Sequence, residues 1–275
     1  MNREQSKELA IQLAKRKLSL VICGGGHVGY YVEQLGRMLD FDVTVVDDRA
    51  EFANTNRFPK SKVICAPFEE AIEYIEAPEN CYFVLVSRGH AYDVRSLEAV
   101  LKKGFKYAGM MGSEAKIKLI MDRMRTVGFE ESLLERVHTP IGMRIGAVTP
   151  AEIGISIAAE LVQVKNKQNE APYVGSGVIE AIHTEEAMVI ATIISKSGST
   201  PCGLGSTLVL KKDGTTVGTV GGGKVEYVAI ERAKQLIGID TEEILRCNMA
   251  STGENKVGMV CGGEVEILLQ SIVES

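Results

Sequence analysis

The sequence lacks tryptophan, long basic runs and long apolar runs. Lys and Arg number 31 against 36 Asp and Glu among 275 residues, a formal net charge of −5, so nucleic acid is not an expected partner. The longest apolar runs are strand-sized, well below the roughly 20 residues that a membrane helix needs. The N-terminal segment shows no secretory signal pattern, so we expect a cytoplasmic protein with no membrane partner.

The chain also lacks a Cys-x-x-Cys pair, and its six scattered cysteines favour reduced thiols over a disulfide framework or a zinc site. Cys202 and Cys261 lie beside glycines, where a thiol near helix-terminal dipoles or a lysine would be partly ionised. For both, a functional and a structural role stay open. The other four lie in or at the ends of strand-like runs and are expected to be buried small hydrophobic residues: Cys23, Cys65, Cys81 and Cys247.

Between residues 18 and 163, short β-branched runs alternate with glycine turns and helix-like stretches. The runs are almost continuously apolar, which is typical of strands covered on both faces by helices. This pattern predicts an α/β protein with a Rossmann-like, doubly wound parallel sheet. The expected strands are residues 18–23, 42–47, 62–66, 82–87 and 106–111, and the expected helices are residues 28–39, 93–103, 113–127 and 151–164.

A polar segment that contains Pro172 separates this region from a different pattern downstream. There, strand-like runs follow one another through tight turns, with Asp213-Gly214 as the clearest hairpin signal and one helix near residues 225–236. We therefore predict a Rossmann-like nucleotide-binding domain in residues 1–166, a linker in 167–175 and a smaller C-terminal α+β domain in 176–275.

The segment from Gly24 to Gly29 matches G-x-G-x-x-G, directly after a predicted strand and at the start of a predicted helix. Glycines there permit a sharp turn and close approach of the backbone to a diphosphate, which the helix N-terminus attracts. Asp47 ends the next strand, where a carboxylate would hold ribose hydroxyls and repel a 2′-phosphate, so NAD is favoured over NADP. The alternative is a glycine turn kept only for packing.

Polar residues follow the other predicted strands and are expected at the same carboxyl edge of the sheet. His27, His90 and His138 come from three different strand-end loops, and with Asp93 they either converge on one ligand or metal or have separate hydrogen-bonding roles. The remaining residues at these strand ends are Ser87, Arg88, Gly89, Gly112 and Ser113.

Two glycine-rich segments stand out in the second domain, and neither matches a Walker P-loop. Gly221, Gly222 and Gly223 lead from a strand into a helix, so their amides, together with Lys224, would cradle an anion. The other segment runs from Ser197 to Gly205 around Cys202.

These motifs together resemble the XdhC/CoxI family of xanthine dehydrogenase accessory proteins, which mature molybdenum hydroxylases. The second domain is similar to the family's XdhC/CoxI module through AMVIATIISKSGSTPCGLGSTLVL, DGTTVGTVGGGKVE and MVCGGEVEILL. The first is similar to its Rossmann module through LVICGGGHVG, VTVVDDRAEFANTNRFP, SRGHAYD, GMMGS and HTPIGMRIGAVTPAEIGISIAAEL. The Rossmann module comes first here, the reverse of the familiar order, and Cys202 stands where the family usually has Arg.

The resemblance implies a chaperone that binds the molybdenum cofactor (molybdopterin), supports its sulfuration by a cysteine desulfurase and delivers it to an apo-molybdenum hydroxylase. The subgroup resembled is associated with selenium-dependent enzymes. NAD or another nucleotide is expected in the Rossmann domain, a homodimer is expected, and Cys261 is the thiol expected near molybdenum. The implied binding residues are Gly24, Gly26, His27, Gly29, Asp47, Arg49, Ser87, Arg88, Gly89, His90, Gly112 and Ser113, and, in the second domain, Gly198, Ser199, Thr200, Pro201, Gly221, Gly222, Gly223, Glu226 and Gly262.

Two other functions stay open at this point. One is an NAD(P)-dependent oxidoreductase with His90 or His138 as acid or base near the nicotinamide. The other is a regulatory protein that senses a nucleotide through the Rossmann domain. The second domain offers glycines and thiols rather than the catalytic His or Lys and substrate arginine of a dehydrogenase, and this favours the non-catalytic chaperone, since a fold alone fixes no chemistry.

Overall fold

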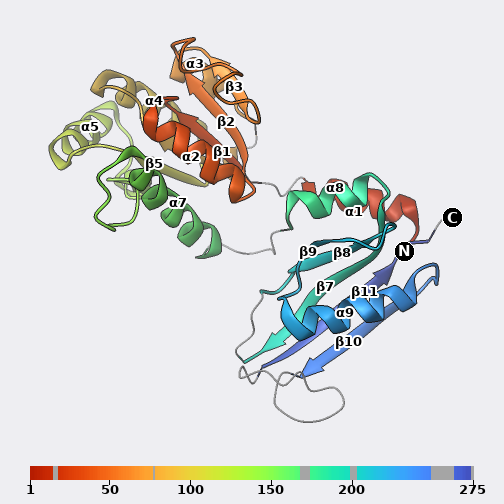
Figure 1. Ribbon diagram of the computed structural model, residues 1–275. Helices are drawn as coiled ribbons and strands as arrows, with labels where there is room; N and C mark the ends of the chain where they lie inside the picture. The colour runs from red at the N-terminus through yellow and green to blue at the C-terminus, as the bar shows by residue number, and fades with distance from the viewer. Residues whose placement is uncertain (15–17, 77, 168–173, 199–202, 249–262, 274–275) are drawn as a thin grey trace. The chain divides into compact units, whose positions relative to one another are not determined.

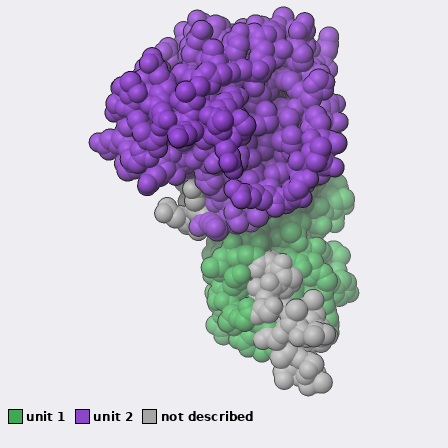
Figure 2. All heavy atoms as spheres, turned by 90° about the vertical axis from the view of Figure 1, so that its left-hand side faces the viewer, with its two compact units in different colours: residues 1–16, 170–275 green, residues 17–169 purple. Residues whose placement is uncertain are grey.

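The computed structural model describes residues 1–14, 18–76, 78–167, 174–198, 203–248 and 263–273. The chain forms two compact units, residues 17–169 and residues 1–16 with 170–275 (Figures 1 and 2). Among the described residues, no helix is both long enough and apolar enough to cross a membrane.

The unit of residues 17–169 is built on a parallel sheet with strand order β3-β2-β1-β4-β5-β6 (Figure 1). This is the order typical of dinucleotide-binding folds, and it confirms the predicted Rossmann-like class. Its strands are β1 (Ser19–Cys23), β2 (Asp42–Asp47), β3 (Lys62–Cys65), β4 (Cys81–Leu85), β5 (Tyr107–Met110) and β6 (Val137–His138). Its helices are α2 (His27–Met38), α3 (Phe68–Glu73), η1 (Pro78–Asn80), α4 (His90–Lys103), α5 (Glu114–Val127), α6 (Glu131–Leu134) and α7 (Pro150–Lys167).

Both faces of this sheet are buried, as the continuous apolar runs predict. Successive residues of β1 point to opposite faces: Leu20 and Ile22 pack with α2 and α7, whereas Val21 and Cys23 pack with α3, α4 and α5. Because the strands are parallel, their carboxyl ends and the following loops share one edge, which is where the predicted site residues lie.

The second unit contains an antiparallel sheet with strand order β10-β11-β7-β8-β9, which matches the predicted small α+β domain. Residues from β7, β8, β10 and β11 pack against α9 to form its largest core cluster. The elements are α1 (Arg3–Ala14), α8 (Ser176–His183), β7 (Ala187–Ser197), β8 (Thr207–Lys211), β9 (Thr216–Gly218), α9 (Gly223–Leu236), β10 (Glu242–Asn248) and β11 (Glu264–Ser271).

The structure departs from the predicted domain boundaries at the N-terminus. Helix α1, placed by the sequence argument in the domain of residues 1–166, belongs to the second unit. The Arg3 Nη1 donates to the carbonyl of Ala187 at 2.6 Å, and Asn2 forms a β-bridge with Val273. The apolar partner of α1 is α8, a helix that the sequence analysis did not predict and whose Val178 and Ile182 are buried.

Candidate functional site

The first glycine loop joins β1 to α2 in close contact with its neighbours. The amide of Gly24 donates to the carbonyl of Val46 at 2.8 Å, which ties the loop to β2. A Cβ atom at Gly25 would collide with the carbonyl oxygen of Phe52, and one at Gly29 would collide with that of Gly24. Glycine is therefore required at these two positions by packing alone.

Gly26 differs from its neighbours because a Cβ atom built on it would meet nothing within 4 Å. It immediately precedes α2, and the amides of Gly26, His27 and Val28 donate to no other group of the described residues. The loop lies between the carboxyl ends of β1 and β4, where the strand order reverses. Open space beside free amides at a helix N-terminus is suited to a phosphate or diphosphate.

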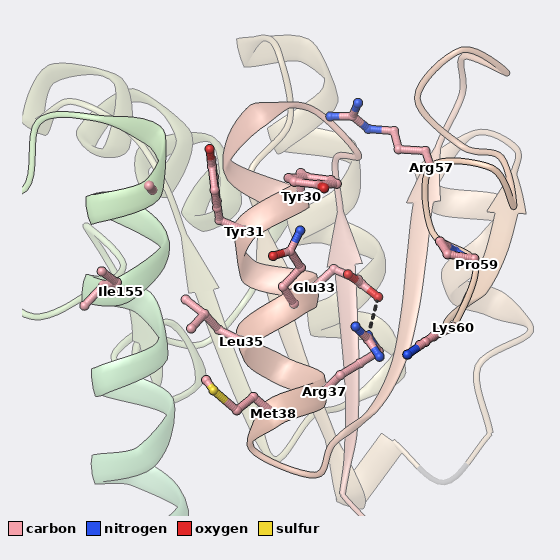
Figure 3. Close-up of a pocket in the computed structure, with 12 residues that line it drawn as sticks. Tyr30, Tyr31, Glu33, Leu35, Arg37, Met38, Arg57, Pro59, Lys60 and Ile155 are labelled. Carbon is pink, nitrogen blue, oxygen red and sulfur yellow. Dashed lines mark hydrogen bonds and ion pairs between the residues drawn. The ribbon is translucent and has the colours of Figure 1, made fainter.

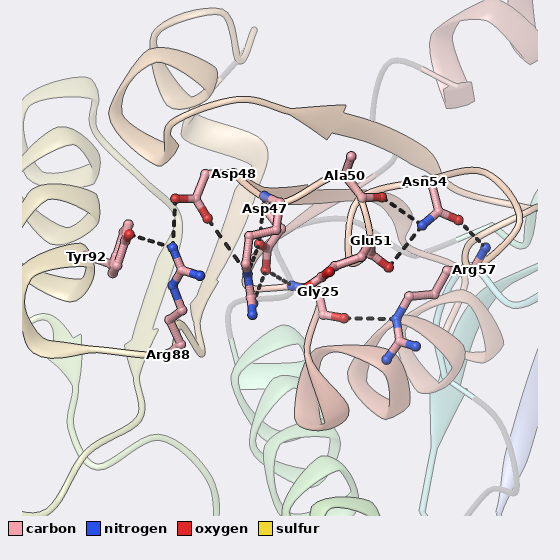
Figure 4. Close-up of polar contacts among 10 residues, drawn as sticks. Gly25, Asp47, Asp48, Ala50, Glu51, Asn54, Arg57, Arg88 and Tyr92 are labelled. Carbon is pink, nitrogen blue, oxygen red and sulfur yellow. Dashed lines mark hydrogen bonds and ion pairs between the residues drawn. The ribbon is translucent and has the colours of Figure 1, made fainter.

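The carboxylate of Asp47, at the end of β2, is fully engaged within the chain (Figure 4). Its Oδ2 accepts from the Gly25 amide at 2.9 Å and from Arg49 Nη2 at 3.0 Å, and its Oδ1 accepts from the Arg49 amide at 3.1 Å and from Arg49 Nε at 2.9 Å. Burial acts to raise the pKa of Asp47, but the hydrogen bonds from Arg49 and Gly25 outweigh it and hold the pKa below its ordinary value. Asp47 is 1% exposed, so Arg49 covers the carboxylate that the sequence assigned to ribose.

Two further arginines lie around the loop (Figure 4). The Arg57 Nε donates to the carbonyl of Gly25 at 3.0 Å and its Nη2 to that of Gly26 at 3.4 Å, and its guanidinium lies 5.0 Å from the centre of the Tyr30 ring. The sequence analysis did not single out Arg57. The available sequence signal was the position of Arg57, a basic residue in the glycine-free segment that follows the acidic end of β2.

Arg88 lies at the adjoining strand end. Its Nη2 donates to Asp48 Oδ2 at 3.1 Å and to the Tyr92 hydroxyl at 2.5 Å (Figure 4). Arg88 thus links the loop after β4 to the loop after β2. Of the other residues predicted there, Gly89 precedes α4, His90 is its first residue, and Ser113 caps α5 just after Gly112.

At the same edge, the half-buried Lys116 and the buried Ser87 and Asp93 form a polar cluster. The Ser87 hydroxyl donates to Asp93 Oδ1 at 2.5 Å, and the Lys116 ammonium forms an ion pair with Asp93 Oδ2. Asp93 is fully buried, so these two partners are what compensate its charge. Lys116 was not predicted as a site residue. Its position in the first turn of α5, three residues after the Ser113 cap, is the only sequence signal for it.

Of the three predicted histidines, His138 is hydrogen-bonded within the chain. His138 Nδ1 lies 2.9 Å from Glu160 Oε1, which also accepts from the Tyr107 hydroxyl at 2.6 Å, while the Gly142 amide donates to Oε2 at 2.8 Å. Burial acts to raise the pKa of Glu160, but the bonds from His138 and Tyr107 outweigh it, so the pKa lies below its usual value. Among the described residues, no three His, Cys, Asp or Glu side chains are arranged to hold a metal ion.

The second glycine loop is closed by the chain's own carboxylate. Glu226 Oε2 accepts from the amides of Val220 at 3.1 Å and Gly222 at 3.2 Å, and from the Thr219 hydroxyl at 2.5 Å. The Gly221 amide donates to the Thr219 hydroxyl oxygen at 3.0 Å. The loop is thus an anion-binding nest of the predicted kind, but its anion is Glu226, which was predicted to bind cofactor.

Several predicted site residues lie outside the described residues: Ser199, Thr200, Pro201, Cys202, Cys261 and Gly262. Gly198 directly follows β7. The expectation of buried cysteines holds for Cys23, Cys81 and Cys247 and is wrong for Cys65, which is exposed because β3 is an edge strand. Burial raises the pKa of Cys81 to about 11, so this thiol stays protonated at neutral pH.

A groove of about 570 Å³ runs along α2, on the side of the helix rather than at the edge of the sheet (Figure 3). Tyr30 and Arg57 lie at the end nearer the glycine loop, and Arg37, Met38 and Lys60 lie toward the other end. Arg57 therefore borders both the groove and the glycine loop.

Comparison with known proteins matches both units. A model of the XdhC Rossmann domain matches residues 20–161, and a model of the XdhC and CoxI family matches residues 181–247. The uncharacterized protein YqeB of Escherichia coli (strain K12) is 35% identical over 150 residues, which are 54% of this chain and 27% of that protein. A protein of Bacillus subtilis (strain 168) named as a probable xanthine dehydrogenase subunit is 24% identical over 166 residues, 60% of this chain and 48% of that protein.

The chain thus spans about a quarter and about half, respectively, of the lengths of these two relatives. The solved structure of a xanthine dehydrogenase from Bacillus halodurans aligns with a TM-score of 0.50 at 22% identity, covering 56% of this chain and 44% of that one. At this identity the likeness concerns the fold alone.

Proposed function

Because the chain belongs to the XdhC and CoxI family, we propose that it is a xanthine dehydrogenase accessory protein that matures a molybdenum hydroxylase. In this proposal it binds the molybdenum cofactor as cargo in the cytoplasm, holds it while a cysteine desulfurase supplies sulfur, and delivers it to the apo-hydroxylase. A selenium-dependent hydroxylase is one candidate client. The protein acts as a chaperone, and as a homodimer, rather than as an enzyme.

The observation that carries the proposal is the joint match of one chain to the XdhC Rossmann domain and to the XdhC and CoxI family. A relative named for xanthine dehydrogenase supports the same client class. The open crevice at Gly26 adds a physical reason, because free amides at a helix N-terminus suit the phosphates of a nucleotide or of a pterin dinucleotide.

The two glycine loops differ in how well they suit this cargo. The first glycine loop is open at Gly26 and there suits a phosphate group, either of NAD or of the nucleotide half of a pterin dinucleotide. The loop at Gly221–Gly223 does not fit as an anion cradle while Glu226 accepts its amides, so we assign it no phosphate. Cys261 remains the proposed thiol near molybdenum, with Cys202 as the second candidate.

Anaerobic purification from a host that makes molybdenum cofactor tests the proposal. Metal analysis and oxidation of bound pterin to its fluorescent product should reveal molybdenum and pterin in stoichiometric amounts. Purified protein that carries nucleotide but neither pterin nor molybdenum, and that leaves activation of the hydroxylase unchanged, would overturn the chaperone role in favour of redox or nucleotide-sensing functions.

The variant Gly26→Val tests the crevice without disturbing the fold. A side chain at Gly26 has open space and an ordinary backbone conformation, so we expect the melting temperature to change by no more than about 2 °C. The same side chain would fill the space that a phosphate needs, so retained nucleotide or pterin should fall at least about tenfold. Gly26→Ala should give a smaller loss, and equal retention by all three proteins would remove the loop from the binding site.

A further inference from the structure

The carboxylate of Asp47 has no remaining capacity for ribose hydroxyls. An ionised carboxylate offers about four lone-pair positions. Asp47 accepts hydrogen bonds from the Gly25 amide, the Arg49 amide and two nitrogens of the Arg49 guanidinium. The side chain is buried beneath Arg49, so a ribose diol would reach it only by displacing a charge-assisted, two-point contact.

The group that faces outward at the end of β2 is the Arg49 guanidinium. Its Nε and Nη2 are held by Asp47, whereas Nη1 donates to no acceptor among the described residues. Its Cζ lies 3.8 Å above the Phe52 ring, and this stacking fixes the plane of the fork. Its side chain is 25% exposed, enough for a ligand to reach it.

Arg57 adds a second cation on the other side of the glycine loop. Its Nε is anchored to the carbonyl of Gly25 (Figure 4), and its Nη2 donates to that of Gly26. Among the described residues, no carboxylate lies within ion-pair distance of it. An arginine held by backbone carbonyls keeps its full charge and loses little side-chain freedom when it binds a further anion.

Three carboxylates lie among these arginines, and Asp48 Oδ1 is also 3.9 Å from Arg49 Nε. Asp47 is neutralised by Arg49, and Asp48 by Arg88 at 3.1 Å. Glu51 is exposed and forms no ion pair with Arg49, Arg57 or Arg88 within the described part of the chain. The three carboxylates therefore equal the three arginines in number, and what this end of the loop offers a ligand is the N–H groups of Arg49 and Arg57 that have no acceptor among the described residues.

We infer that this site selects a nucleotide with a phosphate on its ribose, held by Arg49 and Arg57, over a nucleotide with a free ribose diol. The inference rests on the proposed nucleotide role of the glycine loop. It reverses the preference for NAD that Asp47 alone suggested, because an arginine at this position accommodates a 2′-phosphate. The remaining N–H groups of a guanidinium donate to phosphate oxygens, whereas a guanidinium offers a diol no acceptor for the hydroxyl protons.

Calorimetric titration of the full chain with two probes that differ by one phosphate tests the inference: AMP and adenosine 2′,5′-bisphosphate. We expect the bisphosphate to bind about tenfold more tightly, the gain typical of one charge-assisted phosphate contact. Arg57→Gln should weaken binding of the bisphosphate more than binding of AMP, and so remove most of this preference. Arg49→Lys, which keeps the charge but loses the fork, should reduce the preference in part.

Arg95→Gln is the matched control, because Arg95 is an exposed arginine on α4 that pairs with Glu69 away from the loop. It should keep the full preference. Equal or tighter binding of AMP by the unaltered protein would overturn the inference while leaving the nucleotide site in place. Binding of neither probe would overturn this inference and the nucleotide role of the loop, whereas the chaperone proposal is decided separately by the pterin and molybdenum content. Loss of AMP and bisphosphate binding together in Gly26→Val would support the nucleotide role of the loop, and an unchanged preference in Arg49→Lys and Arg57→Gln would overturn the role of the arginines.

Discussion

The two glycine loops of this chain look alike in sequence and differ in what occupies them. Each joins a strand to a helix, and each has a backbone amide held by a side-chain carboxylate. Around Gly26 the carboxylate of Asp47 takes one amide and leaves the helix N-terminus open. Around Gly222 the carboxylate of Glu226 takes two amides and a hydroxyl.

The comparison shows that a run of glycines before a helix builds an anion nest without fixing the anion. The identity of the anion depends on whether an acidic side chain can fold back. Glu226 lies in the first turn of α9 and reaches back over its own loop, whereas the corresponding turn of α2 carries no acidic residue. Of these two loops, only the second has an acidic side chain folded back over it, so the first is the better ligand site.

The largest expected effect comes from filling the tight part of the first loop. In Gly29→Ala, the added Cβ would collide with the carbonyl oxygen of Gly24, which cannot move without disturbing β1 and α2. We expect a loss of about 3 kcal/mol in the free energy of unfolding, measured by urea denaturation. Gly26→Ala is the matched control and should lose little. Similar losses in both variants would show that the open space at Gly26 does not exist in solution.

Removing the Asp47 charge should have an intermediate effect. Asp47→Asn replaces the carboxylate that accepts from both the Arg49 guanidinium and the Gly25 amide. We therefore expect a loss of about 2 kcal/mol in the free energy of unfolding at pH 7. Because the folded-state pKa of Asp47 lies below its ordinary value of 3.8, the stabilisation is present above that pH and is lost as pH falls through the folded-state pKa.

The stability difference between this variant and the unaltered protein should therefore shrink in urea titrations below pH 3.8. A difference that stays constant down to about pH 2.5 would mean that the charge of Asp47 does not produce it.

The smallest expected effect is at the second loop. Glu226→Ala leaves the amides of Val220 and Gly222 without their acceptor, at a cost of about 1 kcal/mol in a partly exposed site. The emptied nest should then bind an external anion, so millimolar phosphate should raise the melting temperature of Glu226→Ala more than that of the unaltered protein. Glu231→Gln, on the same helix and paired with Lys234, is the control. An equal response of all three proteins to phosphate would contradict the nest.

The sequence was most informative where burial dictates residue choice. The runs at β1, β2, β4 and β5 were predictable because a parallel strand covered on both faces must be apolar throughout. Helix α8 was not predicted, because its eight residues follow the polar segment and are too short to show a clear helical period. The assignment of α1 was missed because the sequence does not show which core a short helix joins, and here that core includes α8.

At the site, the elements could be predicted but the pairings between side chains could not. The sequence places Asp47 at a strand end, yet only the conformation of the following turn brings the Arg49 fork onto it. Likewise Glu226 was identified as a binding residue from its motif, and its geometry shows that it binds its own loop. In both cases the motif correctly indicates a site for charged groups, whereas the three-dimensional structure determines which groups the carboxylate pairs with.

The division of the second unit between two distant stretches of the chain has a consequence for synthesis. Helix α1 leaves the ribosome before residues 17–169, but α8 and strands β7 to β11, on which it packs, are made only after them. The Rossmann unit can therefore fold on the ribosome as soon as it emerges, whereas α1 must wait for the α8 cluster against which its Leu9 packs. Translation order thus makes the Rossmann unit the first to mature, with the smaller unit closing last.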